Sequence, residues 1–456
     1  MFNNKNIHMI GIGGISMSSI AMILKSFDCN ITGYDLNKSD NTDKLLKNGF
    51  EINFDFNYKN IDKADIIVYT AAIKDDNPEL VYARKLNKEV YERSTFLGLL
   101  MREYKNVICI SGTHGKSTTT GMISSIFLNK LNPTISIGAN LPIINGNYHV
   151  GSKEFFIAEA CEYVDSFLDF FPTCEIILNI DNDHLDYFKN IDNIINSFKR
   201  FTTLLPENGF LIINADDENT LFACRDVKKK ITFGIENSAN YMAKNITYNE
   251  KGYSTYDLYI NNSFVDKIIL NVPGKHNILN SLASIASAYC YNISFEDIKN
   301  GLYNYKGVQR RFEYVGQING ASIYDDYAHH PREILSTLNS CQKTKHNKNY
   351  IIFQSHTYSR TKDHLNDFAK ILSKFDNIII TKIYAARENN DVNIHEEDLV
   401  NLIKQYGNQN VIYLDTFDKI ENYIKENVNE NDLILTVGAG DIYKVAYNLK
   451  DSTLLK

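Results

Sequence analysis

The segment Ser111–Thr118, with the sequence Ser-Gly-Thr-His-Gly-Lys-Ser-Thr, carries residue types that bind a polyphosphate. It follows the apolar run Val107–Ile110 and precedes a helix-like stretch, so we predict a strand, a phosphate-binding loop and a helix start. Glycines let backbone N–H groups surround phosphate oxygens, and a helix N-terminus adds partial positive charge. Lys116 would reach the terminal phosphates and Ser117 would bind magnesium, so the expected ligand is a nucleoside triphosphate.

The spacing of this loop departs from the general P-loop pattern. Gly-x-x-x-x-Gly-Lys-Ser requires a glycine at position 110, where this chain has Ile110, so only the shorter core Gly112–Ser117 is present. The alternative interpretation is a glycine turn with a solvated lysine. The strand, loop and helix context favours phosphate binding.

Two acidic clusters, Glu159–Glu162 and Asp181–Asp186, follow expected strands downstream of this loop. The carboxyl ends of parallel strands are where α/β sheets place ligands. Oxygen ligands with one imidazole suit magnesium or manganese. Either cluster alone would be a helix cap or a solvated turn, but the pair beside a phosphate loop favours metal binding.

The N-terminal segment contains a second glycine turn, Gly11-Ile-Gly-Gly-Ile-Ser16, followed by Asp35 at the end of the next strand. It resembles a dinucleotide fingerprint in which Ser16 replaces the third glycine. An NAD site, a structural turn and a site for another diphosphate all remain open. The second phosphate loop downstream favours two phosphate-bearing ligands over one nicotinamide cofactor.

Further polar groups precede expected helices in the second half of the chain. Pro273–Asn280 is either a glycine turn with an asparagine cap or an adenine contact, and Arg310-Arg311 is either a solvated linker or a phosphate contact. Asp325–Pro331 and Ser355–Thr361 each follow a strand, so we expect them to face one crevice and form a ligand site.

The elements that must position these groups alternate as β-strands and amphipathic helices, which predicts an α/β fold in three units, with parallel sheets in the first and the third. The asparagines at 261 and 262 predict a hairpin turn within a strand-rich stretch, residues 231–272. The expected strands are 7–12, 30–34, 66–69, 107–110, 155–159, 175–179, 210–213, 321–325, 350–354, 378–381, 411–414 and 433–437. The expected helices are 15–27, 78–86, 191–201, 277–289, one after Pro331 and one ending at Leu372.

Composition narrows the class of protein. The chain has 456 residues, 44% hydrophobic and 23% charged, and a net charge of -7 without a basic stripe, so we expect no nucleic-acid partner. No apolar run approaches the roughly 20 residues that span a bilayer, which predicts a cytoplasmic protein without a membrane partner. Its seven cysteines are scattered and lack a Cys-x-x-Cys pair, so we expect reduced thiols.

Together these motifs resemble the Mur ligases of peptidoglycan synthesis, nearly from end to end. The resemblance covers the segments 11–18, 112–117, 179–184, 276–280, 310–313, 325–331, 353–356, 359–361 and 438–442. It implies a Rossmann-like domain for a UDP-sugar at residues 1–103, a central P-loop ATPase domain at 104–311, and a Rossmann-like C-terminal domain at 312–456 that closes over nucleotide and amino acid.

The resemblance also implies the chemistry and the ligands. In the branch that this chain resembles most, the lactyl carboxylate of UDP-N-acetylmuramate takes the γ-phosphoryl group of ATP, and the amine of L-alanine attacks the acyl phosphate. ATP and Mg²⁺ are the implied cofactors, and a monomer or homodimer is expected.

Site residues follow by motif. The UDP-sugar contacts are Gly11, Gly13, Gly14, Ser16, Asp35, Thr70, Ala71 and Ala72. The ATP contacts are Gly112, Thr113, His114, Gly115, Lys116, Ser117, Thr118, His276, Asn277, Asn280, Arg311 and Asp325. Ser117, Glu159 and His184 would hold the metal, and Tyr327, His329 and Arg360 would hold alanine. Catalytic roles are expected for Lys116, Glu159, His184, Arg311 and His329.

Some positions depart from the family pattern. Many relatives have an arginine at Thr357, Cys161 replaces an aspartate, and Asp165 is a candidate to replace part of that acidic pattern. The alternative hypotheses for the function are the sister ligase that attaches a recycled tripeptide, a folate polyglutamate synthase, an NAD-dependent dehydrogenase and a nucleotide-dependent binding module without turnover.

Overall fold

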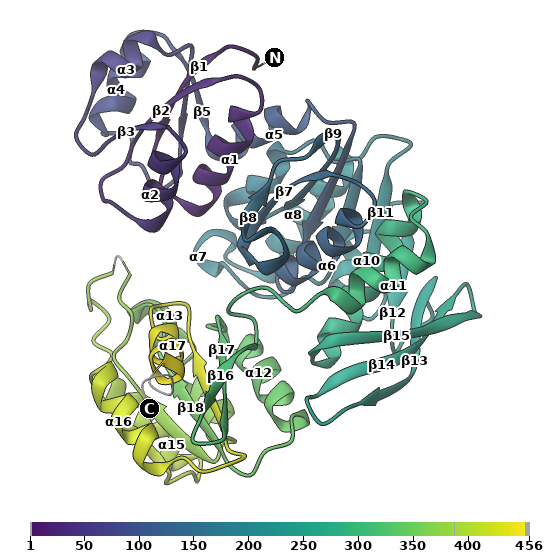
Figure 1. Cartoon of the computed structure of the whole chain (residues 1–456), viewed down its shortest axis with the longest axis vertical. Coiled ribbons are helices and arrows are strands. Elements are labelled where there is room, and N and C mark those ends of the chain that lie inside the picture. Colours follow the sequence, from purple (N-terminus) through teal and green to yellow (C-terminus); the bar gives the residue numbers. More distant parts are fainter. Residues whose placement is uncertain (1, 387, 452–456) are drawn as a thin grey trace. The chain divides into compact units, whose positions relative to one another are not determined.

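The computed structural model describes residues 2–386 and 388–451, and these form three β-sheets (Figure 1). The chain makes two compact units. One contains the residues up to Asn245, Tyr256–Ile268 and Leu279–Lys306, and the other contains Ile246–Thr255, Ile269–Ile278 and the residues from Gly307 onward. The predicted α/β class is confirmed, while the domain boundaries after residues 103 and 311 stay predictions.

The first sheet has five parallel strands in the order β3-β2-β1-β4-β5. Its strands are β1 (Asn6–Ile10), β2 (Asn30–Tyr34), β3 (Glu51–Asn53), β4 (Ile66–Tyr69) and β5 (Glu89–Glu92). Its helices are α1 (Ile15–Lys25), α2 (Asp40–Lys47), α3 (Tyr58–Lys63), α4 (Pro78–Lys85) and α5 (Arg93–Met101). Side chains of α1, α2 and α5 join one apolar cluster with the sheet, and those of α3 and α4 join another. The strand order reverses beside β1, where α/β sheets bind ligands.

The first strand ends two residues before the predicted end at Ile12. Gly11 has φ 81°, and the N–H groups of Gly11 and Ile12 both donate to the carbonyl of Tyr34, at 2.7 and 3.1 Å. The backbone therefore turns at Gly11, because its positive φ takes the chain out of the sheet.

The second sheet has ten strands in the order β15-β14-β13-β12-β11-β10-β6-β9-β7-β8. The strands are β6 (Asn106–Ser111), β7 (Pro133–Leu141), β8 (Gly146–His149), β9 (Ser152–Glu159), β10 (Cys174–Ile177), β11 (Phe210–Asn214), β12 (Ile231–Gly234), β13 (Tyr241–Tyr248), β14 (Tyr253–Ile260) and β15 (Ser263–Pro273). The helices are α6 (Lys116–Leu128), α7 (Leu185–Phe188), α8 (Ile191–Phe201), α9 (Glu218–Ala223), α10 (Lys275–Cys290) and α11 (Phe295–Asn304), with short 3₁₀ helices at Pro142–Ile144, Tyr163–Asp169 and Thr202–Leu204.

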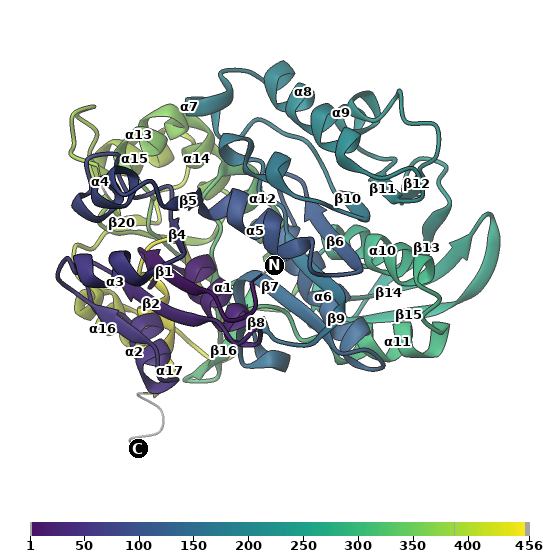
Figure 2. The ribbon, with the colours of Figure 1, turned by 90° about the horizontal axis from the view of Figure 1, so that it is seen from above.

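Helices cover both faces of the central strands. Side chains of α8 and α9 pack with Val107 and Cys109 of β6, whereas α6 lies on the opposite face beside α11 (Figure 2). The predicted hairpin turn is confirmed, since Asn261 and Asn262 join β14 to β15 with φ 48° and 66°. The antiparallel pair β7 and β8 is an addition that the sequence analysis missed.

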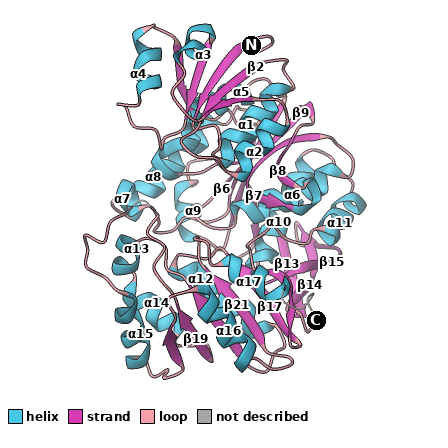
Figure 3. Ribbon diagram, turned by 60° about the vertical axis from the view of Figure 1, so that its left-hand side comes forward, coloured by secondary structure: helices cyan, strands magenta, loops and turns pink. Residues whose placement is uncertain are grey.

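The third sheet has six strands in the order β16-β17-β21-β18-β19-β20. Its strands are β16 (Glu313–Ile318), β17 (Ala321–Asp326), β18 (Asn349–Phe353), β19 (Asn377–Ile380), β20 (Val411–Tyr413) and β21 (Leu433–Val437). Its helices are α12 (Pro331–Lys343), α13 (Tyr358–Asp363), α14 (Leu365–Leu372), α15 (Glu396–Gln405), α16 (Phe417–Asn427) and α17 (Tyr443–Asp451). Apolar side chains of α12, α14 and α15 cover one face, and those of α16 and α17 cover the other (Figure 3).

Two predictions for this domain need correction. The sheet is not wholly parallel, because the edge strand β16 pairs antiparallel with β17 through a short turn at Asn319 and Gly320, whose φ angles are 51° and 80°. The helix expected to end at Leu372 is two helices, because His364 between them has φ −113° and ψ 16°, outside the helical region.

All seven cysteines are free, and Cys109, Cys174, Cys224 and Cys341 are buried, as expected for reduced thiols. Among the described residues, none of the helices combines the length and the apolar character needed to cross a bilayer.

A carboxyl group lies inside the central sheet. Glu175 of β10 faces Cys109 of β6 in register and is 0% exposed. Neither carboxylate oxygen has a hydrogen-bond partner among the described residues. Burial raises the pKa of Glu175 well above its ordinary value, so the folded protein favours the neutral acid.

This burial predicts a pH-dependent contribution to stability. Below the pKa of the unfolded chain, about 4.3, Glu175 is protonated in both the folded and the unfolded state, so it does not change the free energy of unfolding with pH. As the pH rises above that value the unfolded chain ionises while the folded chain does not, so stability falls by about 1.4 kcal/mol per pH unit up to the folded pKa. We expect Glu175→Gln to gain thermal stability relative to wild type between pH 5 and pH 8, measured by calorimetry.

The control is Glu207→Gln, because Glu207 is exposed. It should leave the pH profile of the melting temperature unchanged. A constant offset between Glu175→Gln and wild type at both pH values would contradict the prediction, since a cost of burying the amide does not depend on pH.

Candidate active site

The predicted phosphate loop connects β6 to α6. Gly112 has φ 131° and Gly115, the residue before the helix, has φ 89°. A Cβ at Gly112 would lie 3.1 Å from the backbone of Asn179, and one at Gly115 would lie 2.8 Å from Oδ1 of Asn280. Both positions therefore need glycine, and Asn280 of α10 packs directly against the loop. Thr118 lies in the first turn of α6.

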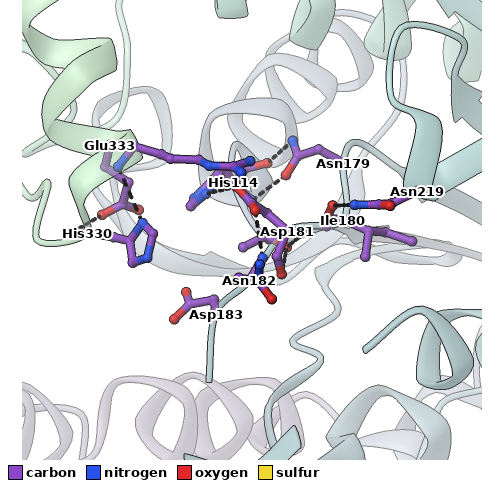
Figure 4. A network of polar contacts seen from close by, with 12 residues as sticks. His114, Asn179, Ile180, Asp181, Asn182, Asp183, Asn219, His330 and Glu333 are labelled. Atoms are coloured by element: carbon purple, nitrogen blue, oxygen red, sulfur yellow. Dashed lines mark hydrogen bonds and ion pairs between the residues drawn. The ribbon is translucent and has the colours of Figure 1, made fainter. Parts of the chain in front are cut away.

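Hydrogen bonds join this loop to the chain that follows β10. The N–H of His114 donates to Oδ1 of Asn179 at 2.8 Å, and Nδ2 of Asn179 donates to the carbonyl of His114 at 3.0 Å (Figure 4). The N–H of Thr113 donates to the carbonyl of Asn179 at 3.0 Å, and the N–H of Asp181 donates to the Thr113 hydroxyl at 2.9 Å. The Asn179–His184 motif therefore begins by fixing the loop.

Lys116 is folded back onto its own loop. Its Nζ donates to the carbonyls of Gly112 and Thr113, at 2.6 and 3.2 Å, and forms an ion pair with Glu162 at 2.9 Å. The side chains are 16% and 2% exposed. Burial lowers the pKa of Lys116, but the neighbouring Glu162 carboxylate outweighs it, so the net pKa is raised and the amine stays charged.

Glu162 was part of an acidic cluster in the sequence, but its partner was not predicted. Cys161 beside it stands where many relatives have an aspartate, and no spacing rule pairs Glu162 with a lysine 46 residues earlier. The other candidate, Asp165, has a different task. Its carboxylate accepts hydrogen bonds from Ser197, from Arg200 at 3.1 Å and from Tyr187 at 3.1 Å, which holds α8 in place.

The predicted metal ligands lie at the carboxyl ends of adjacent strands. Ser117 is in the first turn of α6, Glu159 ends β9 beside Ile110, and His184 follows β10. Oε1 of Glu159 accepts from the N–H of Gly138 at 2.8 Å, which leaves Oε2 for a ligand. The His184 ring lies against that of Tyr163, with centroids 4.5 Å apart and planes tilted by 32°.

This donor set fits magnesium bound together with a nucleotide. Among the described residues there is no group of three or more His, Cys, Asp or Glu that could hold an ion without other ligands. Magnesium commonly uses one or two carboxylates and takes its other ligands from phosphates and water. Ser117 and Glu159 offer oxygen ligands of that kind and His184 adds one imidazole, so the magnesium site stays a prediction.

The predicted adenine-side residues begin α10. Nδ1 of His276 pairs with the Ser336 hydroxyl at 2.9 Å, and Nδ2 of Asn277 donates to the carbonyl of Pro273 at 2.7 Å. Asn277 therefore contacts the turn before the helix as a donor from within the first turn of α10, which is not the capping contact that the alternative predicted.

The glycine turn of the first domain is built around Asp35. The N–H of Gly13 donates to Oδ2 of Asp35 at 2.8 Å, and a Cβ at Gly13 would lie 2.8 Å from that oxygen. A Cβ at Gly11 would lie 2.6 Å from Thr70, so β1 and β4 end side by side here. Gly14 precedes α1, and Ala71 and Ala72 are exposed beside Thr70.

Arg93 at the start of α5 was missed by the sequence analysis. Its Nη1 lies 3.4 Å from the hydroxyl of Ser16 in the glycine turn. Arg93 also lies close to Cys161. Burial raises the pKa of the Cys161 thiol, and the positive charge of Arg93 opposes that rise. The sequence contained one signal for this residue. Arg93 directly follows the strand β5, which ends at the same edge of the sheet as β1 and β4.

In the third domain, Asp325 is paired internally. It is 0% exposed, its Oδ2 accepts from Nε of Arg310 at 3.1 Å, and its Oδ1 accepts from the Thr436 hydroxyl at 2.6 Å. Burial raises the pKa of Asp325 to about 6, despite the charge of Arg310. Each oxygen therefore already accepts one hydrogen bond from the protein, and the predicted ribose contact stays a prediction. Arg311, with Tyr327 under its guanidinium at 5.4 Å, is the more accessible cation.

The predicted amino-acid residues gather at the ends of β17 and β18. The His329 ring lies 5.4 Å from that of Tyr327 and 5.9 Å from that of His356. Burial lowers the pKa of His329, and Arg360 and Arg311 lower it further against the effect of Glu333. Arg360 also helps burial to lower the pKa of His356 to about 4. A neutral imidazole pair therefore lies close to a permanently charged guanidinium.

Glu333 holds this segment at the start of α12. Its Oε2 accepts from the N–H groups of His329 and His330, at 3.0 and 3.2 Å (Figure 4).

Each of the two units contains its own cluster of predicted site residues. The unit that begins at the N-terminus holds the glycine turn, the phosphate loop, Glu159 and His184, and the other holds Tyr327, His329 and Arg360.

Comparisons with known proteins cover most of the chain. Residues 6–105 match the model described as Mur ligase family, catalytic domain. Residues 110–288 match the Mur ligase middle domain, and residues 310–440 match the Mur ligase, glutamate ligase domain.

Individual relatives match from end to end. The chain is 49% identical over 444 residues to the UDP-N-acetylmuramate–L-alanine ligase of Clostridium acetobutylicum, covering 97% of this chain and 96% of that protein. It is 47% identical over 456 residues to the enzyme of the same name from Acetivibrio thermocellus, covering 99% and 97%.

Solved structures show the same fold. The crystal structure of the UDP-N-acetylmuramate–alanine ligase of Thermotoga maritima superposes with a TM-score of 0.84 at 27% identity, covering 99% of this chain and 100% of that one. A murein peptide ligase of Psychrobacter arcticus superposes with a TM-score of 0.69 at 22% identity, covering 98% of both chains, and it is similar in fold alone.

The Lys116–Glu162 pair predicts how nucleotide affinity responds to mutation. We expect Glu162→Gln to tighten binding of a nucleoside triphosphate about fivefold, roughly 1 kcal/mol, because the phosphates no longer compete with a carboxylate for Lys116. The nucleotide-free protein should melt at a lower temperature, since the buried lysine loses its counter-ion. Titration with a fluorescent nucleotide and thermal melting measure both effects.

Glu154→Gln is the matched control, because it makes the same charge change near the other end of β9, where Glu154 pairs with exposed Lys105. It should alter neither quantity. Unchanged or weaker nucleotide binding by Glu162→Gln would show that the pair does not oppose phosphate binding.

Proposed function

The chain belongs to the Mur ligase family, and from that membership we propose that it is an ATP-dependent ligase that joins L-alanine to UDP-N-acetylmuramate. The observation that carries the proposal is the end-to-end match to relatives of that name, 49% identical over 97% of this chain. The predicted phosphate loop, with its charged lysine, supports the proposal, because such chemistry needs a polyphosphate site.

The reaction requires activation because a carboxylate is a poor electrophile. A lactyl carboxylate oxygen attacks the γ-phosphorus of ATP, the bond from that phosphorus to the β,γ-bridging oxygen breaks, and ADP leaves. The neutral amine of L-alanine then attacks the acyl carbon of the acyl phosphate. Inorganic phosphate leaves with the bonding electrons and the amine loses a proton, which yields the amide. Positioning and charge stabilisation supply most of the catalysis in phosphoryl transfer.

Lys116 would exchange Glu162 for the terminal phosphate and offset its developing charge. Its retained proton suits that task, since only a charged amine stabilises the transition state. Ser117, Glu159 and His184 would hold Mg²⁺, which when bound neutralises phosphate charge. Asn179 keeps the loop in place while the lysine moves, because it binds the backbone of His114 and not a side chain.

The other substrates would use the two remaining clusters. The turn Gly11–Ser16, with Thr70, Ala71 and Ala72, lies at the switch point of the first sheet and would contact the UDP-sugar. Arg93, close to Ser16, is an added candidate for its diphosphate. Arg360 would pair with the carboxylate of L-alanine between Tyr327 and His329, and Arg311 would contact phosphate.

A direct assay tests the proposal. The purified protein is given UDP-N-acetylmuramate, ATP, Mg²⁺ and either L-alanine or the tripeptide of murein recycling, and ADP and the amide product are quantified. We expect ADP and product with L-alanine. Preference for the tripeptide would assign the sister activity, and ADP formation without an amide product would leave only a nucleotide hydrolase. Cytoplasmic location and the monomer or homodimer state stay predictions.

The role proposed for Lys116 has its own test. Lys116→Ala should lower kcat/KM by about 100- to 1000-fold, roughly 3–4 kcal/mol, as expected when one charge-stabilising donor is removed. Binding of UDP-N-acetylmuramate, measured by calorimetry without ATP, should change less than threefold. Lys130→Ala is the control, because Lys130 follows the far end of α6. Equal losses in turnover and in sugar-nucleotide binding would contradict the assigned role.

A further inference from the structure

The backbone between β18 and α13 is strained at Thr357. This residue has φ 63° and ψ 149°, a combination that glycine adopts and that β-branched residues avoid. Thr357 directly precedes α13, the helix that carries Arg360. Such a conformation persists only where the surrounding structure fixes it, so the contacts of Thr357 show what sets the start of this helix.

One set of contacts comes from the loop after β19. The N–H of Thr357 donates to the carbonyl of Tyr384 at 2.9 Å, and the N–H of Tyr384 donates to the carbonyl of Ser355 at 2.9 Å. The two segments form a parallel bridge, and the rings of His356 and Tyr384 stack with an interplanar angle of 20°. On the helix side, the Thr361 hydroxyl donates to the carbonyl of Thr357 at 2.6 Å.

Glu388 of the same loop completes the arrangement. Its Oε2 accepts from the N–H of Ser359 at 2.9 Å, and its Oε1 accepts from the Ser359 hydroxyl at 2.6 Å. Burial raises the pKa of Glu388, but hydrogen bonds from Ser359, Thr357 and Tyr358 outweigh it, so the net pKa is lowered and the group is a carboxylate at neutral pH. One anionic side chain therefore receives the polar hydrogens of the first turn of α13.

The orientation of that turn decides where Arg360 points. The N–H of Arg360 lies 3.4 Å from the Thr357 hydroxyl, so the arginine follows directly from the strained residue. Its charge already acts on His329 and His356. A guanidinium binds a carboxylate through two parallel hydrogen bonds, and such a pair tolerates little displacement.

We propose that Glu388 is a positioning residue for the amino-acid substrate: it holds Thr357 and Ser359 so that α13 presents Arg360 to the carboxylate of the incoming amino acid. The inference rests on the proposed function, because that function makes Arg360 the partner of the amino acid. Glu388 itself touches no reacting atom. Glu388 therefore affects the KM for the amino acid and does not affect the rate of phosphoryl transfer.

Steady-state kinetics of Glu388→Gln test this role. The amide keeps the shape of the side chain, but its NH₂ cannot accept a hydrogen bond from Ser359. We expect the KM for L-alanine to rise at least tenfold, while kcat at saturating L-alanine and the KM values for ATP and UDP-N-acetylmuramate stay within threefold. A rise of less than fivefold for L-alanine, or equal rises for all three substrates, overturns the proposal.

The matched control is Glu396→Gln. Oε1 of Glu396 accepts from the N–H of Ile383 at 2.8 Å, so this variant makes the same charge change at a contact of the same loop without touching α13. It should leave the KM for L-alanine within twofold. An equal rise in both variants would reduce Glu388 to general support of the loop and overturn its specific role.

Glycine at position 357 provides a rescue. Because glycine adopts the observed backbone angles without strain, Thr357→Gly removes the reason for a clamp. The double variant Thr357→Gly/Glu388→Gln should have a KM for L-alanine at least threefold lower than Glu388→Gln alone. A KM equal to or above that of Glu388→Gln would show that strain at Thr357 is not what Glu388 holds.

Hydrogen exchange separates this inference from the proposed function. In the ligand-free protein, the amide of Ser359 should exchange at least tenfold faster in Glu388→Gln than in wild type, with no change in α14. This readout does not need turnover. If wild type forms no ADP with UDP-N-acetylmuramate and L-alanine, the proposed function fails, whereas unchanged exchange at Ser359 overturns the clamp.

Discussion

The geometry of the phosphate loop depends on one amide side chain. Asn179 binds the N–H and the carbonyl of His114 at the same time, and its own carbonyl accepts from Thr113. This ties the loop after β6 to the chain after β10, which are adjacent parallel strands. The amide groups that would face a phosphate are therefore fixed before any ligand binds, which spares the cost of ordering them during binding.

Two charged groups of the candidate sites form ion pairs inside the protein. Lys116 is held by Glu162, and Asp325 is held by Arg310. A buried charge without a partner is far more costly than a paired one, so each pair lowers the cost of keeping an ionised group inside the protein. The two pairs have different roles. A phosphate would attract Lys116 away from Glu162, whereas Asp325 accepts hydrogen bonds from Arg310 and Thr436 and so fixes the position of Arg310.

Positive φ angles occur at the start of several predicted ligand-binding segments, but the residues that adopt them differ. In the glycine turn and the phosphate loop, Gly11, Gly112 and Gly115 adopt such angles without a side-chain penalty. Thr357 adopts one at a cost and needs Tyr384 and Glu388 to hold it. The glycine positions need no contact from elsewhere in the chain. The conformation of Thr357, by contrast, depends on the loop that follows β19.

The amino-acid sequence by itself determined the α/β class, most central strands, the Asn261-Asn262 hairpin and the phosphate loop, because these depend on local periodicity and on glycine at fixed positions. The end of β1 at Gly11, the antiparallel edge strand β16 and the break at His364 came only from the structure, since neighbouring segments decide them. Likewise, the ion pair of Glu162, the internal pairing of Asp325 and the clamp by Glu388 join residues far apart in the chain. Sequence spacing carries no information about such contacts, because only tertiary packing brings those side chains within hydrogen-bond distance.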